Sequence, residues 1–294
     1  MNLAEAQDLF TENLTNKSRA QATITAYSKD IEQLINYLKK QKIEDVEAVK
    51  SEDLNGYMKK LAEENYTPKS ISRKTNSTKT FFRFLYEEKG VIKSNPADLV
   101  SHPKLNPKAP RILSKIEYKA LRDAVKDDSR TLAIVEILLQ TGVRISELSG
   151  IKLEEINLSE ENHDKEQGKL FVPKRGSTPE REIPLNNSVQ KAIKEYLKIR
   201  PKSGKDYLFV TKTGNQLLVR NIRATLDKYF KDIGLEGVKV NDLRHTFIAH
   251  HLQRGAPLYI VSKIAGHKRI STTEKYLEYI TINEKTNGYE LEEL

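Results

Sequence analysis

The sequence predicts a mainly α-helical protein of two domains, an N-terminal domain of four helices and a C-terminal α+β domain with a small β-hairpin. The chain has 294 residues, a length that corresponds to about two domains. Apolar residues recur at helical spacing in both halves. Proline restricts its predecessor and removes a backbone donor, and prolines interrupt the middle of the chain at Pro96, Pro103, Pro107 and Pro110. We therefore predict domains at 1–94 and 113–294, with a linker at 95–112.

Composition narrows the class of partner. The formal net charge is +9, which favours a polyanion such as nucleic acid, because each neutralised phosphate releases counterions. A soluble protein that is merely rich in lysine is the alternative. The absence of cysteine excludes disulfides, thiolate metal sites and a cysteine nucleophile, and it fits a cytoplasmic location. We expect no membrane span and no signal peptide, since no long apolar run is present.

The first region contains one helix of particular interest. Its start is predicted at Thr67-Pro68, an N-cap residue followed by proline at the first helical position. One face of this helix is apolar. A second face, at offsets of 4, 7, 11 and 14, is polar and consists of Lys69, Arg73, Asn76, Thr80 and Arg83. We expect this face to bind DNA along a phosphate backbone or in a major groove; a solvated helix face is the alternative.

The second region mixes helices with two short strands. Ser114 and Glu117 have the spacing of a capping box. An apolar helix is predicted from Thr131 to Leu139 and stops at Thr141-Gly142, a glycine suited to a C-terminal cap. Strands are predicted at 168–172 and 181–185 on either side of a hairpin turn. Further helices are predicted at about 188–199, 219–233, 242–254 and 257–265.

Four residues in the second region suit phosphoryl transfer. Arg144 and Arg244, on separate helices, are able to grip one phosphate and stabilise developing charge, although each alone also fits a surface ion pair. His267 follows a helix end and suits a phosphate contact or proton transfer; a capping role is the alternative. The pattern from Ser271 to Glu274 is that of a capping box and places Tyr276 in the early turns of a helix. Tyr279 is a neighbouring competitor.

In combination and order, these residues resemble the tyrosine recombinase family, also called lambda-integrase-like, and most closely its short Xer-type members. Thr141–Leu148 is similar to the motif around the family's first catalytic arginine, and Leu243–Phe247 to the motif around its second. Gly266-His267 and Tyr276 match the last histidine and the nucleophile. The resemblance covers nearly the whole chain. It implies a SAM-like core-binding domain followed by a catalytic domain of the DNA breaking-rejoining type.

Two further positions follow from the resemblance. The family's catalytic lysine lies in a β-hairpin, where Lys174 is the best match and Arg175 the fallback. The turn is two residues longer than in the common Xer form, and an even insertion keeps the strand faces in register. The family usually has histidine three residues before the second arginine, but this chain has Asn241. An amide donates hydrogen bonds but exchanges no protons at neutral pH, so we expect Asn241→His to keep or raise the cleavage rate.

The resemblance implies a mechanism without metal or nucleotide cofactor. Tyr276 would attack a scissile phosphate and form a 3′-phosphotyrosine, which conserves the energy of the phosphodiester. Arg144, Arg244 and His267 would stabilise the phosphate oxygens. Lys174 would protonate the leaving 5′ oxygen. Two successive strand exchanges would pass through a Holliday junction.

The resemblance also implies the partners. We expect double-stranded DNA with an inverted-repeat site, a homotetramer on two such sites, and docking of the segment from about Thr281 to Leu294 into a neighbouring subunit. Whether a second recombinase or an activator takes part is left open. The expected roles are Xer-like chromosome or plasmid dimer resolution, or integration and excision of a small mobile element. The alternative is a catalytically impaired accessory protein that binds DNA with the same fold.

Overall fold

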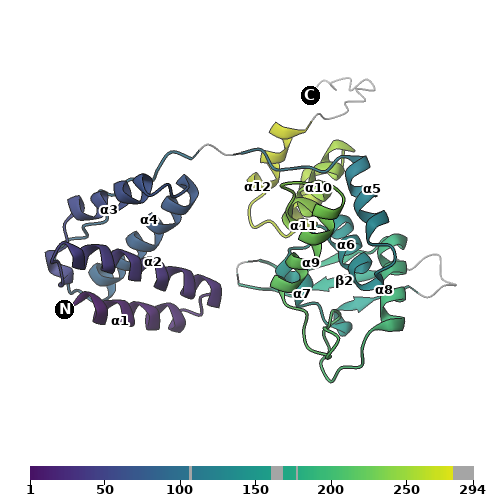
Figure 1. Cartoon of the computed structure of the whole chain (residues 1–294), viewed down its shortest axis with the longest axis horizontal. Helices are drawn as coiled ribbons and strands as arrows, with labels where there is room; N and C mark the ends of the chain where they lie inside the picture. Colours follow the sequence, from purple (N-terminus) through teal and green to yellow (C-terminus); the bar gives the residue numbers. More distant parts are fainter. Residues whose placement is uncertain (106–107, 160–167, 177, 281–294) are drawn as a thin grey trace, which may run out of the picture. The chain divides into compact units, whose positions relative to one another are not determined.

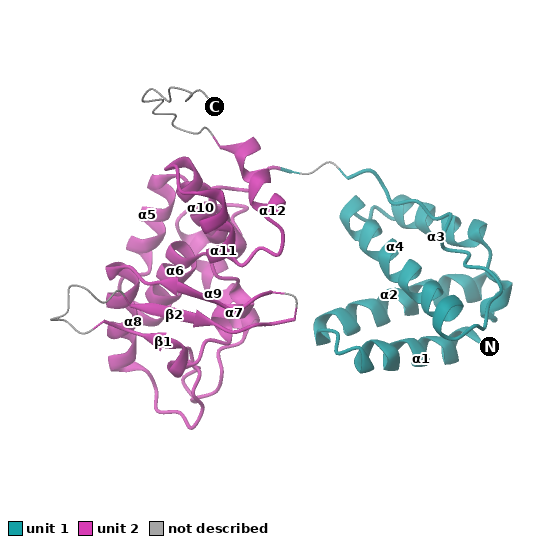
Figure 2. Ribbon diagram, turned by 180° about the vertical axis from the view of Figure 1, so that it is seen from behind, with its two compact units in different colours: residues 1–108 teal, residues 109–294 magenta. Residues whose placement is uncertain are grey.

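The computed structural model describes residues 1–105, 108–159, 168–176 and 178–280 (Figure 1). The chain divides into two compact units, Met1–Lys108 and Ala109–Leu294, which are distinguished by colour in Figure 2. The mainly helical architecture with a small sheet in the second unit confirms the predicted fold class. Among the described residues, no helix is both long enough and apolar enough to cross a membrane.

The first unit contains the four predicted helices, α1 (Leu3–Asn16), α2 (Gln21–Lys40), α3 (Ser51–Glu63) and α4 (Pro68–Arg83). Helix α4 begins as its sequence predicts, because Thr67 Oγ1 accepts a hydrogen bond from the Ser70 amide at 3.2 Å. Aromatic side chains from α1 and α4 meet in the core. The rings of Phe10 and Phe81 pack edge to face at 5.3 Å.

The core of the first unit includes residues beyond the predicted domain boundary at 94. Ala97 and Val100 are both buried in it. Two hydrogen bonds hold this segment in place: Asn95 Oδ1 accepts from the Ala97 amide at 3.0 Å, and Ser51 Oγ donates to the Pro96 carbonyl at 2.8 Å. Proline thus excludes regular structure here without preventing packing. A linker role for the remainder of 95–112 stays a prediction.

A buried ion cluster joins α2 to α4. Asp30 is 3% exposed. It accepts hydrogen bonds from Lys74 Nζ at 2.9 Å and Ser77 Oγ at 3.1 Å, and it pairs with Arg73. Lys74 is equally buried, so its ammonium depends on the Asp30 carboxylate for charge compensation.

Asp30→Asn is expected to destabilise the first unit by about 3 kcal/mol, because removing one partner leaves a buried charge uncompensated. Amide hydrogen exchange of α2 and α4 in the full chain measures the loss. Asp8→Asn, at an exposed position of α1, is the matched control and should change stability by no more than about 0.5 kcal/mol. Equal effects of the two substitutions would contradict a stabilising role for the cluster.

The second unit consists of helices around a three-stranded sheet. Its antiparallel strands are β1 (Ile156–Asn157), β2 (Lys169–Val172) and β3 (Arg181–Pro184), side by side in that order. Val172 of β2 pairs with Arg181 of β3. The predicted hairpin is confirmed, and β1 is an addition to it. The elements in chain order are α5 (Lys115–Ala124), α6 (Ser129–Thr141), α7 (Ile145–Ser149), β1 (Ile156–Asn157), β2 (Lys169–Val172), β3 (Arg181–Pro184), α8 (Asn187–Ile199), α9 (Val219–Asp232), α10 (Val240–Gln253), α11 (Leu258–Ala265), α12 (Ser271–Glu274) and a 3₁₀ turn (Lys275–Tyr279).

Helix α6 is the central helix of this unit. Nearly all of its apolar side chains are buried, and it packs against α8 and α10 (Figure 1). It ends at Gly142 in the left-handed conformation, as predicted. The capping box at Ser114 and Glu117 is also confirmed, with reciprocal bonds of 3.3 and 2.7 Å.

The capping box predicted from Ser271 to Glu274 is wrong. The N-cap of α12 is Ile270, whose backbone is already helical. The Glu274 amide therefore donates to the Ile270 carbonyl at 3.0 Å, and Ser271 is the first helical residue. The expected position of Tyr276 is little affected, because this residue lies in the 3₁₀ turn that continues α12.

Candidate active site

Two glycine carbonyls hold the two predicted arginines. The carbonyl of Gly142, at the end of α6, accepts a hydrogen bond from Arg244 Nη1 of α10. The carbonyl of Gly266, at the end of α11, accepts from Arg144 Nη2 at 2.8 Å, and Arg144 is the N-cap of α7. Each guanidinium is thus fixed by a helix end from a distant part of the chain.

Both positions require glycine. Gly142 and Gly266 have φ of +63° and +67°, values that other residues rarely adopt. A Cβ at Gly142 would lie 2.3 Å from the Phe247 ring, and one at Gly266 would lie 2.7 Å from Cζ of Arg181. The close approach of these backbones therefore sets the positions of Arg144 and Arg244.

A buried carboxylate, Glu147, orients the first arginine. Its oxygens accept from the Arg144 amide at 2.8 Å and from Arg144 Nη1 at 3.0 Å. They also accept from both terminal nitrogens of Arg181 at 3.1 and 2.8 Å. Arg181 is 4% exposed and donates through Nε to the Ile264 carbonyl at 2.7 Å. The site contains three guanidinium groups, those of Arg144, Arg181 and Arg244, and Glu147 compensates the charge of one of them. The remaining positive charge suits the site to bind an anion.

Arg181 is a residue of this site to which the sequence motifs assigned no role. A signal was present, because Arg181 alternates with Ile183 and Leu185 along the second strand of the hairpin. This alternation places the arginine on the buried face. A buried arginine needs a carboxylate, and Glu147 lies in the motif around Arg144.

Tyr276 is buried, with 7% of its surface exposed. Burial raises the pKa of its hydroxyl, while Arg244 acts in the opposite direction. Burial and Arg144 lower the pKa of Arg244 to about 10, so its guanidinium stays charged at neutral pH. The phenol keeps its proton at neutral pH and faces a fixed positive charge.

The hydroxyl of Tyr276 contacts a histidine that was not among the predicted site residues. His245 Nδ1 lies 2.6 Å from Tyr276 Oη, and His245 Nε2 lies 2.8 Å from Asn241 Nδ2. Asn241 and His245 are one turn apart on α10, which brings their side chains together. Among the described residues, the contact between Asn241 and the tyrosine runs through His245.

His267 lies beside the same tyrosine. The two rings are nearly parallel, with centroids 6.4 Å apart, and His267 Nδ1 lies 2.7 Å from Thr273 Oγ1. Burial, followed by the charges of Arg244 and Arg144, lowers the pKa of His267 to about 4. In the free protein its ring is therefore neutral at pH 7, and an anion among these arginines would raise that pKa.

The hairpin separates Lys174 from the other predicted residues. Lys174 is exposed, and in the described ranges no hydrogen bond or ion pair joins it to the arginines, His267 or Tyr276. Arg175 donates instead to the carbonyls of Ser146 and Gly150 at 3.0 and 3.2 Å. The backbone near α7 thus holds Arg175, whereas the Lys174 side chain is exposed.

The predicted DNA-binding face of α4 lies at the surface. Lys69, Arg73, Asn76 and Arg83 are exposed and Thr80 is half-buried. Thr80 Oγ1 donates to the Asn76 carbonyl at 2.7 Å, and the Arg73 guanidinium pairs with Asp30. Contact of this face with DNA stays a prediction.

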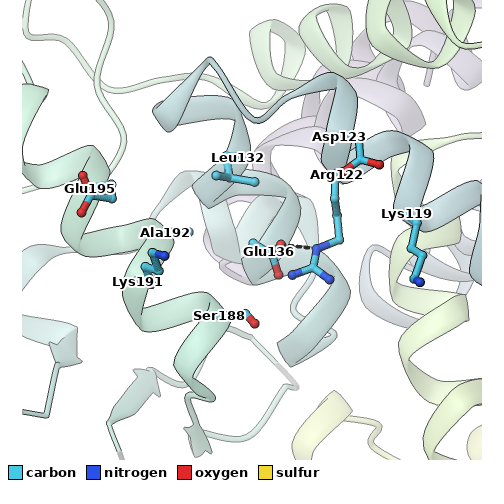
Figure 3. Close-up of a pocket in the computed structure, with 9 residues that line it drawn as sticks. All are labelled: Lys119, Arg122, Asp123, Leu132, Glu136, Ser188, Lys191, Ala192 and Glu195. Carbon is cyan, nitrogen blue, oxygen red and sulfur yellow. Dashed lines mark hydrogen bonds and ion pairs between the residues drawn. The ribbon is translucent and has the colours of Figure 1, made fainter.

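A hollow of about 600 Å³ lies elsewhere in the second unit. Its residues lie on α5, α6 and α8, and Figure 3 shows Arg122 directed toward the buried Glu136. Charges of both signs line it, and it includes neither Arg144, Arg244, His267 nor Tyr276. The arginine cluster is therefore the stronger candidate for phosphate chemistry.

Comparison with known proteins identifies the family. The profile of the Phage integrase family matches residues 111–280. That of the phage integrase N-terminal SAM-like domain matches residues 8–89. The chain belongs to the tyrosine recombinase family.

Relatives and solved structures agree with this assignment. Tyrosine recombinase XerC of Thermodesulfovibrio yellowstonii is 33% identical over 275 residues, which cover 88% of this chain and 86% of that protein. XerC of Bacillus pumilus is 33% identical over 284 residues, covering 91% and 90%. The fold is similar to that of a lambda integrase dimer bound to a COC′ core site, with TM-score 0.75, 17% identity, and coverage of 100% and 99%. The chain is thus a site-specific tyrosine recombinase of the Xer type.

Proposed function

We propose that this recombinase cuts one DNA strand by attack of Tyr276 on a phosphate. A 3′-phosphotyrosine forms and a 5′-hydroxyl leaves. The observation that carries the proposal is the position of the Tyr276 hydroxyl, which is hydrogen-bonded to His245 and lies in the field of Arg244. The phosphorus–oxygen bond to the tyrosine conserves the energy needed for rejoining.

The arginines and His267 stabilise the phosphate during attack. Arg144 and Arg244 are held by glycine carbonyls, so they are oriented before DNA binds. Donors fixed in advance need no reorganisation as charge develops, and losing one such donor costs about 10²–10³ in rate. His267, neutral in the free protein, supplies a further hydrogen bond to a non-bridging oxygen.

Lys174 is the proposed general acid for the leaving 5′ oxygen. It follows β2 in the hairpin whose second strand begins with Arg181, and the Arg181 side chain reaches Glu147. The Lys174 side chain is exposed and would reach the leaving oxygen once DNA is bound, whereas Arg175 is held by the backbone near α7.

Lys174→Ala is expected to slow cleavage of ordinary DNA by about 10²–10⁴-fold, the range for loss of a general acid. A substrate with sulfur at the 5′ bridging position should restore most of the rate, because a thiolate, with a thiol pKa of about 8.5, leaves without protonation. The matched control is Arg175→Ala, whose defect the sulfur should not repair. An equal defect of Lys174→Ala on both substrates would assign the proton to another group.

The proposed DNA partner is a duplex with an inverted-repeat site. The polar face of α4, formed by Lys69, Arg73, Asn76, Thr80 and Arg83, would contact it, mainly at phosphates. A homotetramer would hold two sites and exchange strands through a Holliday junction. The segment from 281 to 294, expected to dock into a neighbouring subunit, lies outside the described residues.

We propose Xer-like dimer resolution as the cellular role, supported by the match to XerC proteins along almost their full length. The test is to trap covalent adducts on total DNA of the source cell with denaturant and to sequence the attached DNA. A single chromosomal or plasmid inverted repeat is the expected result. Adducts at the ends of a mobile element would instead establish integration and excision. DNA binding without any adduct would favour an accessory protein.

A further inference from the structure

We propose that His245 is the base that takes the proton from Tyr276, and that Asn241 fixes the ring tautomer that makes this possible. The inference rests on the proposed attack by Tyr276. His245 touches the reacting oxygen directly, at 2.6 Å from Nδ1. His267, the other histidine beside Tyr276, has its Nδ1 bound to Thr273 Oγ1.

The hydroxyl of Tyr276 needs a hydrogen-bond acceptor. A buried donor left without a partner costs about 1–3 kcal/mol, and Tyr276 is 7% exposed. Within the part of the chain that the structure describes, His245 Nδ1 is the only hydrogen-bond partner of Oη. The phenol is therefore the donor in this bond, and Nδ1 is the acceptor.

This direction requires the hydrogen of the neutral imidazole to be on Nε2. The Asn241 atom that lies 2.8 Å from Nε2 is the amide nitrogen Nδ2. A half-turn about the Cβ–Cγ bond puts the amide oxygen in its place, where it accepts the Nε2 hydrogen. The half-turn exchanges two atoms of nearly equal size. No other hydrogen bond of the Asn241 side chain is lost by it, as far as the described residues extend. In that orientation the Asn241 amide satisfies the Nε2 hydrogen and stabilises the tautomer in which Nδ1 is free to accept.

Burial, more than the neighbouring charges, keeps the ring of His245 neutral and therefore able to accept a proton. Burial lowers the pKa of His245, Asp242 raises it and Arg244 lowers it, with a net shift below the ordinary value. Tyr276 and His267 face the ring from other elements. Because burial raises the pKa of Tyr276, the phenol does not ionise by itself near neutral pH, and a neighbouring base is needed.

The O–H bond of Tyr276 breaks, and its proton moves to Nδ1 of His245. The freed electron pair forms the bond to phosphorus as the bond to the 5′ oxygen breaks, and Lys174 protonates that oxygen. On rejoining, the imidazolium returns the proton to the tyrosine oxygen, and the uncharged lysine takes back the proton of the attacking 5′-hydroxyl.

His245→Gln tests the base, since glutamine hydrogen-bonds but accepts no proton. With a nicked suicide substrate at saturating protein, we expect single-turnover cleavage by this variant to be slower by about 10²–10⁴-fold near pH 7. The wild-type rate should level off above the pKa of His245, below 6.5. The variant rate should instead rise about tenfold per pH unit to beyond pH 9, because it follows the fraction of tyrosinate.

A positioning role alone would lower the rate without changing the pH profile. A variant that cleaves within about threefold of wild type, or that is slower but keeps the wild-type profile, would overturn the proposal. Thermal stability and DNA affinity of the variant show whether it folds. If wild type forms no adduct, the proposed function itself fails; if both proteins form one with the same profile, only the role of His245 fails.

Nitrogen NMR of the histidine rings tests the tautomer independently of activity. The signals of His245 are assigned by their loss in His245→Gln. The expected result is a hydrogen on Nε2 and a bare Nδ1 in wild type, and a mixture of tautomers in Asn241→Leu, which removes the amide. A hydrogen on Nδ1 in wild type would show that His245 donates to Tyr276, and would overturn the proposal. This result would not depend on the folding of a variant or on DNA binding.

Discussion

Tyr276→Phe is expected to abolish covalent attachment to DNA. The substitution removes only the oxygen that would bond to phosphorus, and loss of a nucleophile in a concerted site lowers the rate by about 10⁶. Binding of DNA should change little, because the arginines are held by Gly142 and Gly266 rather than by Tyr276. The measurement is the fraction of protein that migrates as a denaturant-stable adduct with a nicked suicide substrate.

The matched control is Tyr279→Phe. Tyr279 lies in the same 3₁₀ turn as Tyr276, so both variants lose one phenolic oxygen from one segment. Tyr279→Phe should form the adduct at close to the wild-type rate. An adduct that persists in Tyr276→Phe and disappears in Tyr279→Phe would transfer the nucleophile to Tyr279.

Glu147→Gln is expected to have the largest effect on stability in the second unit. Arg181 would keep its buried charge without a carboxylate, which costs about 3–5 kcal/mol. Arg144 would lose its ion pair as well, so DNA cleavage should also slow. Urea denaturation followed by circular dichroism measures the first effect, and the suicide substrate measures the second.

The pH dependence of stability gives a second signature of Glu147. Burial alone would raise its pKa, but Arg181 and the amide and charge of Arg144 bring the net pKa below its ordinary 4.5. A carboxyl with a depressed pKa contributes stability above the unfolded-state value, and this contribution is lost as pH falls through the folded-state value. Glu147→Gln should therefore lose less stability below about pH 4.5 than wild type does. The control is Glu154→Gln, at an exposed ion pair, whose stability should depend on pH as that of wild type does. If the stability of Glu147→Gln shows the same pH dependence, the Glu147 carboxylate has no stabilising role.

The sequence predicted the elements whose signals are local. Thr67 with Pro68, Ser114 with Glu117, and Gly142 mark helix ends through bonds within a few residues, and these predictions are confirmed. Strand β1 has two residues, too few to show alternation. The capping box at Ser271 was predicted wrongly because the start of α12 depends on the backbone angles of Ile270. Residue types alone do not specify those angles.

In the candidate site, too, the sequence predicted what local motifs indicate and missed contacts between distant residues. The order of motifs predicted Arg144, Arg244, His267 and Tyr276, and the structure gathers them. The motifs did not predict His245, whose partner Tyr276 is 31 residues away. The alternation along the strand indicates that Arg181 is buried, but not that its partner is Glu147, 34 residues away. Long-range pairing of this kind follows from the packing of α10 and the hairpin against their neighbours, which periodicity does not reveal. Asn241 was identified as a departure from the family, but its contact with His245 emerged only from the fold.

The measurement that tests the account most directly is the identification of the residue bonded to DNA. The adduct from a suicide substrate is digested with trypsin and nuclease, and the peptide that retains a nucleotide is fragmented in a mass spectrometer. Tyr276 and Tyr279 both follow Lys275, so fragment ions are needed to tell them apart. Attack by Tyr276 predicts a nucleotide joined through its 3′ phosphate to Tyr276. A nucleotide on Tyr279 or on any other residue, or a link through a 5′ phosphate, would contradict it.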